Sequence, residues 1–176
     1  VSIFWRDAHG IPCKARIDKL KPRTLVDLKK SDNLRGRSFA DALRRDLVAY
    51  RYDIQAEHYF QGYAHLYDFA REGRIFGDCP LRADWGSRIA DPDSIEFTWV
   101  FRSTVGAPIC KGVRLPRTSP VLNRARREIA DGKRLYLDCM ERFGPDQMWV
   151  SNTPIAELGE GDFPRSFVED AAEVLS

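Results

Sequence analysis

Short apolar runs separated by turn residues occupy the start of the chain. Residues 1–5 predict a strand, and the Asp-Ala-His-Gly sequence at 7–10 predicts a turn. A second strand is predicted over residues 11–20 and a third over residues 24–29. Pro22 lies between them and suits the second position of a tight turn. The start of the chain therefore predicts a set of strands joined by short connections.

The pattern then changes to helical spacing. The polar stretch 30–37 predicts a loop, after which Ser38 can cap a helix, with Asp41 in the capping-box position. Asp53 is predicted to cap a second helix that ends near Arg71. The apolar residues that give the first helix its helical spacing are Phe39, Leu43 and Leu47.

Two further strands are predicted in the second half of the chain. Residues 73–94 are rich in Gly, Pro and Asp and predict irregular structure. Residues 95–104 and 108–115 then predict two strands around a turn at Gly106.

A long helix is predicted to follow these strands. It starts at Thr118 or Ser119, has Pro120 in its first turn and reaches about Phe143. The tail after Gly144 is proline-rich and predicts a wrapped or loose segment. The order of elements predicts a mixed α/β fold, with a central mixed β-sheet flanked by helices.

Composition is that of a globular protein with a substantial core. The chain has 176 residues, of which 43% are hydrophobic and 31% charged, which suits a single domain over residues 1–176. The net charge of +2 neither requires nor excludes a nucleic-acid partner. No apolar run approaches the roughly 20 residues that span a membrane, so no membrane association is expected.

The four cysteines point to a reducing compartment. They contain no C-x-x-C pair, so a zinc ribbon or a clustered iron–sulfur site has no support in the sequence. Thiols dispersed in this way through a domain with a large core suggest a cytoplasmic location. The positions are Cys13, Cys79, Cys110 and Cys139.

Two acids and a lysine interrupt the apolar pattern of the early strands. Asp27 and Lys29 are two residues apart and project from one strand face, while Leu28 faces the other way. Asp18, on the partner strand across the proline turn, can reach the same face. Such carboxylates suit Mg²⁺ or Mn²⁺, to which the Leu28 carbonyl could add a ligand. The alternative is an Asp–Lys salt bridge on a solvated sheet face, since an exposed strand also alternates polar and apolar residues.

The second predicted helix adds an amide and a phenol. Gln55 and Tyr59 are four residues apart and therefore share one helical face, where they could together orient a phosphate or a metal-bound water. The alternative is a surface glutamine and a core tyrosine. Taken singly, neither residue indicates a site.

The order of these pieces resembles a known nuclease superfamily. An aspartate, then D-L-K about ten residues later, then Q-x-x-x-Y on the next helix is similar to the PD-(D/E)xK superfamily, in particular to its RecB-type branch and to RecE-like exodeoxyribonuclease VIII. The stretches that carry the resemblance are R-I-D-K (16–19), V-D-L-K-K (26–30), the tract 50–63, and F-T-W-V-F-R-S (97–103).

The resemblance implies a role for each site residue. Asp18 and Asp27 match metal ligands, Lys29 matches the catalytic lysine, and Gln55 and Tyr59 match the helix motif. The family usually has one further acidic or His ligand on a helix before the first strand, so we expect this chain to lack an N-terminal helix of the natural protein.

The implied activity is a Mg²⁺- or Mn²⁺-dependent exonuclease on linear double-stranded DNA in phage-type recombination. By analogy with RecE-like enzymes, a homo-oligomer and a single-strand annealing protein as partner are also expected. Two alternatives stay open: a non-catalytic DNA-binding or assembly module that keeps the nuclease fold, and an unrelated α/β domain in which the charges form a surface ion pair.

Overall fold

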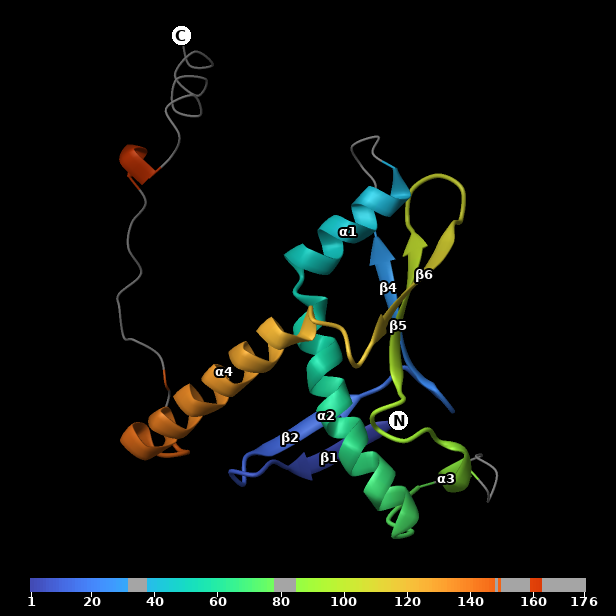
Figure 1. The fold of residues 1–176 in the computed structure, drawn as a ribbon. Helices are drawn as coiled ribbons and strands as arrows, with labels where there is room; N and C mark the ends of the chain where they lie inside the picture. Colours follow the sequence, from blue (N-terminus) through green and yellow to red (C-terminus); the bar gives the residue numbers. More distant parts are fainter. Residues whose placement is uncertain (32–37, 78–84, 148, 150–158, 163–176) are drawn as a thin grey trace. The chain divides into compact units, whose positions relative to one another are not determined.

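The computed structural model (Figure 1) describes residues 1–31, 38–77, 85–147, 149 and 159–162. The chain divides into two compact units, Val1–Tyr136 and Leu137–Ser176. The first unit holds all the strands of the described residues and is the one that contains the site. Within the described residues, no helix has both the length and the apolar character needed to cross a bilayer.

The strands form two sheets. The first is an antiparallel hairpin of β1 (Ser2–Arg6) and β2 (Pro12–Arg16). The second has four strands in the order β3-β4-β5-β6, in which the central β4–β5 pair is parallel and the two outer pairs are antiparallel. Its strands are β3 (Lys19–Lys21), β4 (Thr24–Ser31), β5 (Glu96–Ser103) and β6 (Cys110–Pro116).

Helices pack against these sheets, which confirms the predicted mixed α/β fold (Figure 1). Asp41 N donates to Ser38 Oγ over 3.2 Å, so the predicted cap of the first helix is also confirmed. The helices are α1 (Phe39–Ala49), α2 (Tyr52–Arg71), α3 (Trp85–Arg88), α4 (Leu122–Phe143) and the short 3₁₀ helix η1 (Glu160–Asp162).

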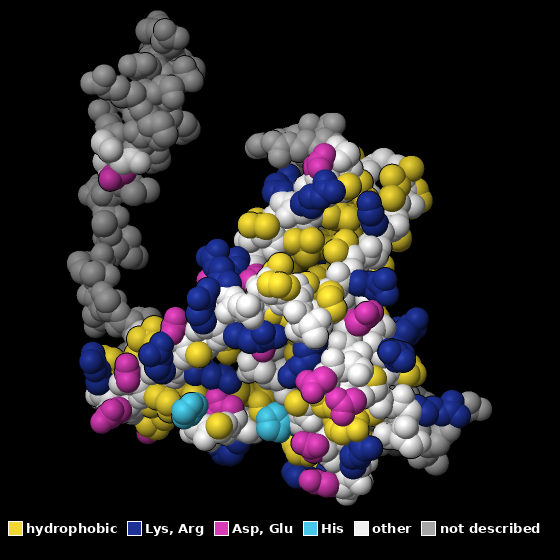
Figure 2. Space-filling model, in the orientation of Figure 1, with side chains coloured by type: hydrophobic (Ala, Val, Ile, Leu, Met, Phe, Trp, Pro, Cys, Tyr) yellow, Lys and Arg dark blue, Asp and Glu magenta, His cyan; other side chains and the backbone are white. Residues whose placement is uncertain are grey.

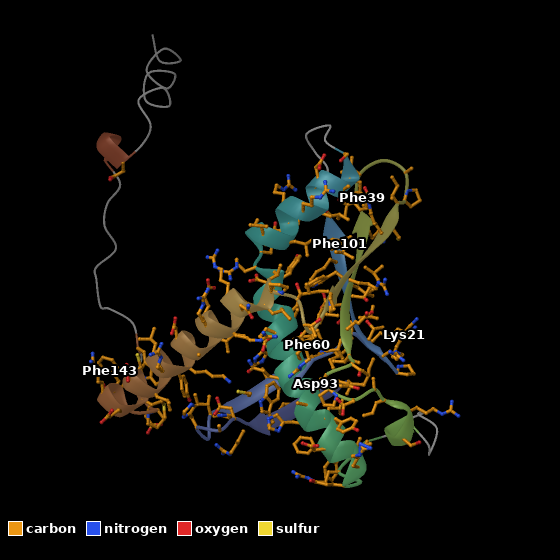
Figure 3. The ribbon with its side chains drawn as sticks, in the orientation of Figure 1. Lys21, Phe39, Phe60, Asp93, Phe101 and Phe143 are labelled. Carbon is orange, nitrogen blue, oxygen red and sulfur yellow. The ribbon has the colours of Figure 1, made fainter. Side chains whose placement is uncertain are left out.

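The main core lies between α2 and the buried faces of both sheets. In β5, residues Phe97, Trp99 and Phe101 alternate with less buried positions, as expected for a strand with one face against helices. Phe60 and Tyr63 of α2 are fully buried against this face. Figure 3 shows Phe60 and Phe101 within this layer. Helix α2 is therefore the element that joins the hairpin to the larger sheet.

One predicted strand is in fact two. Residues 11–20 were expected to be continuous, but β2 and β3 belong to different sheets and separate at Ile17 and Asp18. Ile17 still pairs with the hairpin, because its N and O each bond to Val1 over 2.8 Å. Asp18 instead bonds to the larger sheet, which accounts for the break at this point.

Two predicted helix starts are also wrong. Arg51, and not Asp53, occupies the N-cap of α2, in a left-handed conformation with φ 51° and ψ 48°. Asp53 lies in the first turn of the helix and forms an ion pair with Arg51. Helix α4 begins at Leu122, later than expected, because Pro120 lies in a turn whose carbonyl accepts a bond from Asn123 N.

The predicted irregular stretches lie partly outside the described residues. This holds for 32–37 of the predicted loop 30–37, for 78–84 of the stretch 73–94, and for most of the tail after Gly144. Within the described part, β4 continues to Ser31, two residues into the predicted loop.

Gly62 of α2 lies against the Trp5 ring, and this contact gives a test of the packing. A Cβ at Gly62 would lie 2.9 Å from Trp5 Cη2 and Cζ3, so Gly62→Ala should lower the free energy of unfolding by about 1–3 kcal/mol. The matched control is Gly132→Ala in α4, where nothing lies within 4 Å of the added Cβ. There we expect a gain of about 0.5–1 kcal/mol from helix propensity. Urea denaturation measures both, and equal midpoints for the two variants would contradict the packing.

Candidate functional site

Strand β4 places Asp27 in the middle of the larger sheet, where only 4% of the residue is exposed. The β3–β4 register pairs Lys19 with Val26, and its continuation by one residue places Asp18 opposite Asp27. Leu28 N donates to Asp18 Oδ2 over 2.9 Å, in place of a strand hydrogen bond. The two aspartates predicted from sequence therefore lie beside the same short segment, at the end of β3.

Two side chains hold the Asp27 carboxylate. Gln55 Nε2 donates to Asp27 Oδ1 over 2.9 Å, and Lys29 Nζ lies 2.6 Å from Asp27 Oδ2, in a contact not aligned as a hydrogen bond. Among the described residues, Gln55 Oε1 is buried with no hydrogen-bond partner. The cluster thus holds one charged pair and one buried acceptor that suits a donor such as water.

Lys29 is held from a second side by an aromatic ring. Its Nζ lies 4.6 Å from the centre of the Tyr52 ring, and 19% of its side chain is exposed. Burial, followed by the charge of nearby Asp46, raises the pKa of the Tyr52 phenol above its ordinary value. The phenol therefore stays neutral, and its ring can attract the lysine cation. Asp27 and Lys29 do form the ion pair of the alternative interpretation, but its solvated position is wrong, because the carboxylate is buried.

Tyr59 holds the backbone next to the first aspartate. Its Oη donates to the Arg16 carbonyl over 2.8 Å, two residues before Asp18. One face of α2 therefore contacts both acid-bearing segments, through Gln55 at Asp27 and through Tyr59 near Asp18. In this structure the Tyr59 hydroxyl bonds to the protein backbone, which fits a positioning role.

A second buried carboxylate, which the sequence did not indicate, lies near the cluster. Asp46 of α1 is 4% exposed, and its Oδ2 accepts a bond of 2.6 Å from Ser31 Oγ. Ser31 shares a face of β4 with Asp27 and Lys29, and this alternation was a signal that could have been read from the sequence. Asp46 gave no such signal, because a charged residue on a helix usually faces solvent.

The donor set fits a hard divalent cation. Asp18 and Asp27 supply carboxylate oxygens, and the Leu28 carbonyl faces the Asp18 side because the N–H and C=O of one strand residue point the same way. Within the part of the chain that the structure describes, no group of three or more His, Cys, Asp and Glu residues could hold a metal. Two carboxylates and a carbonyl suit Mg²⁺ or Mn²⁺, which keep several water ligands.

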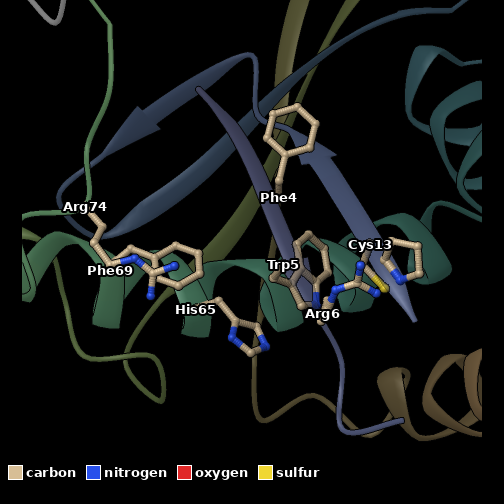
Figure 4. Close-up of a pocket in the computed structure, with 8 residues that line it drawn as sticks. Phe4, Trp5, Arg6, Cys13, His65, Phe69 and Arg74 are labelled. Atoms are coloured by element: carbon tan, nitrogen blue, oxygen red, sulfur yellow. The ribbon is translucent and has the colours of Figure 1, made fainter. Parts of the chain in front are cut away.

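The pocket of Figure 4 is separate from this cluster. It measures about 560 Å³ and lies where the β1–β2 hairpin meets the second half of α2. The His65 ring stacks on Trp5 at 5.9 Å, and the Arg74 guanidinium lies over Phe69. None of the predicted site residues lines this pocket.

Comparison with known proteins supports the expected superfamily. The model of a family described as a PDDEXK-like domain of unknown function (DUF3799) matches residues 1–76, a range that contains all the predicted site residues. The mixed sheet flanked by helices is consistent with a restriction-endonuclease-like core. The match does not distinguish the RecE-like branch from others. None of the curated proteins matches the chain.

The Gln55–Asp27 hydrogen bond can be tested through stability alone. Gln55→Ala leaves a buried carboxylate oxygen without its donor, so we expect a loss of about 1–3 kcal/mol in the free energy of unfolding. The control is the same change in an Asp27→Ala background, where most of the loss should disappear. Urea denaturation of the four proteins measures the coupling, and strictly additive losses would rule out the contact.

Proposed function

We propose that this chain is a metal-dependent nuclease that hydrolyses phosphodiester bonds in DNA. The observation that carries the proposal is the buried Asp27 carboxylate, which Lys29 and Gln55 hold, beside the segment where Asp18 accepts a bond from Leu28 N. The nuclease-type fold supports it. A buried ion pair can often be replaced by apolar residues without loss of stability, so a chemical role is the better account of this arrangement.

Each residue has a chemical task in this proposal. Asp18, Asp27 and the Leu28 carbonyl would hold Mg²⁺ or Mn²⁺, which when bound would stabilise negative charge on the phosphate. Lys29, held as a cation against Asp27 and Tyr52, can pair with a phosphate oxygen. Gln55 fixes Asp27 through its amide nitrogen, and its buried Oε1 can accept a bond from a water that attacks phosphorus.

The finer proposal concerns the substrate and the assembly. The order of Asp18, the D-L-K run at 27–29 and the Q-x-x-x-Y helix resembles RecE-like enzymes, which supports an exonuclease on linear duplex DNA. The same resemblance supports a homo-oligomer and a single-strand annealing protein as partner. These details rest on the resemblance, whereas phosphodiester cleavage rests also on the geometry of the site.

A non-catalytic DNA-binding or assembly module is the second candidate, because one observation favours it. Lys29 Nζ lies 2.6 Å from Asp27 Oδ2 and thus occupies an oxygen that a metal would use. Among the described residues, no group of three or more His, Cys, Asp and Glu side chains that could hold a metal is found either. In that case the ion pair would replace the cation, and the fold would bind DNA without cutting it.

Cleavage of end-labelled linear duplex DNA tests the nuclease proposal. With Mg²⁺ or Mn²⁺ we expect digestion, which EDTA abolishes, and Asp27→Ala should lower its rate at least about a hundredfold because the metal contributes several kcal/mol to transition-state stabilisation. Asp131→Ala is the matched control, since this carboxylate lies on the exposed surface of α4. Equal rates in Asp27→Ala and Asp131→Ala would refute the site. A covalently closed circular substrate should resist an exonuclease.

Metal binding separates the two candidate functions. Calorimetric titration with Mn²⁺ should show binding to the wild type that is lost in both Asp18→Ala and Asp27→Ala but kept in Asp131→Ala, because only the first two remove proposed ligands. Heat that does not depend on Asp18 and Asp27, or no binding at all, would favour the non-catalytic module.

A further inference from the structure

An exposed aromatic ring lies where α1 meets α2. The Tyr50 residue is 66% exposed, yet its ring is ordered by stacking on Tyr52, with centroids 5.7 Å apart and planes at 24°. Tyr52 in turn stacks on buried Trp99 at 6.4 Å and 26°. We call Tyr50, Tyr52 and Trp99 the aromatic stack. It runs from the core of the larger sheet to the surface.

The aromatic stack also contacts the candidate site. Lys29 Nζ lies over the ring of Tyr52, its middle member, and Lys29 pairs with Asp27. Trp99 is the register partner of Asp27 in the neighbouring strand. The exposed ring of Tyr50 is therefore two contacts away from the proposed catalytic lysine.

The turn that presents Tyr50 is held rigidly. Arg51 adopts a left-handed conformation, which is unfavourable for a residue with a Cβ, so it needs support from its surroundings. Its guanidinium supplies that support by pairing with both Asp53 and Glu128, at 3.0 and 2.6 Å. Tyr50 N also donates to Asp46 O over 3.0 Å. A strained turn fixed by two ion pairs, which presents an exposed ring, indicates a binding role more than a packing one.

We propose that Tyr50 is a stacking platform for an unpaired base of a DNA strand whose phosphodiester lies at Asp27 and Lys29. The ring is flat, exposed and fixed, which is what base stacking requires, and stacking of this kind tolerates any base sequence. Lys29 beneath the same stack offers the cation that a neighbouring phosphate needs. Figure 2 shows hydrophobic side chains exposed near the junction of α1 and α2, with Lys and Arg side chains beside them.

This inference deepens the proposed function and rests on it for the identity of the strand. It adds a contact that holds the strand before and after cleavage and takes no part in bond breaking. The proposal concerns an unpaired base, because both faces of a base inside a duplex are covered by its neighbours and only a terminal pair has a free outer face. The nucleic-acid end that enters the site is then single-stranded where it meets Tyr50.

Binding can be measured without cleavage. The 176-residue chain in EDTA is titrated into a short single-stranded oligodeoxynucleotide that contains 2-aminopurine, whose fluorescence falls on stacking. We expect Tyr50→Ala to weaken binding about tenfold and to reduce the quenching, since base–aromatic stacking is lost. Tyr50→Phe keeps the ring face and should bind like the wild type. The matched control is Phe76→Ala, which removes an aromatic side chain that is 91% exposed elsewhere.

Each outcome decides the proposal. Wild-type affinity in Tyr50→Ala, an equal loss in Phe76→Ala, or no binding by the wild type would each overturn the stacking platform. Loss in Tyr50→Ala alone, with unchanged thermal unfolding, would support it. Because EDTA prevents metal-dependent cleavage, a failure of the nuclease assay with intact Tyr50-dependent binding would contradict the proposed function and leave this inference standing.

Discussion

The buried Asp27 carboxylate is the constraint on which the site depends. A charge that is 4% exposed in the centre of a sheet is tolerated only where nearby groups compensate it. Lys29 supplies the opposite charge from the same strand, and Gln55 supplies a hydrogen bond from α2. The position of α2 against the larger sheet is therefore coupled to the charge of a single side chain.

The same helix fixes the second half of the site. Tyr59, one turn after Gln55, donates a hydrogen bond to the Arg16 carbonyl. This bond fixes the position of the backbone two residues before Asp18. Asp18 then replaces a strand hydrogen bond by accepting from Leu28 N. The break between β2 and β3 follows from this geometry, since the chain leaves one sheet and joins the other where Asp18 bonds to β4.

Features that depend on local spacing could be predicted from the sequence, and features that depend on tertiary contacts could not. The period of two placed Asp27 and Lys29 on one face, and the i,i+4 spacing placed Gln55 and Tyr59 together. The break at Asp18 could not be predicted, because it depends on a hydrogen bond to a residue ten positions later. The predicted start of α2 at Asp53 was wrong for a similar reason. Arg51 takes a left-handed conformation that its ion pair with distant Glu128 supports. Asp46 was missed because its burial depends on Ser31 of the sheet.

Stability alone does not explain why these charges are kept. Replacement of a buried ion pair by well-packed apolar residues is often neutral or stabilising, whereas removal of one partner is costly. A chain selected only to fold would therefore tend to place aliphatic residues at Asp27 and Lys29, as it does at Leu25 two positions earlier on the same face. Folding alone does not require the Asp27–Lys29 pair, nor Gln55 with its buried Oε1 that has no partner among the described residues. A catalytic role beside β3 explains why all of these groups are present together.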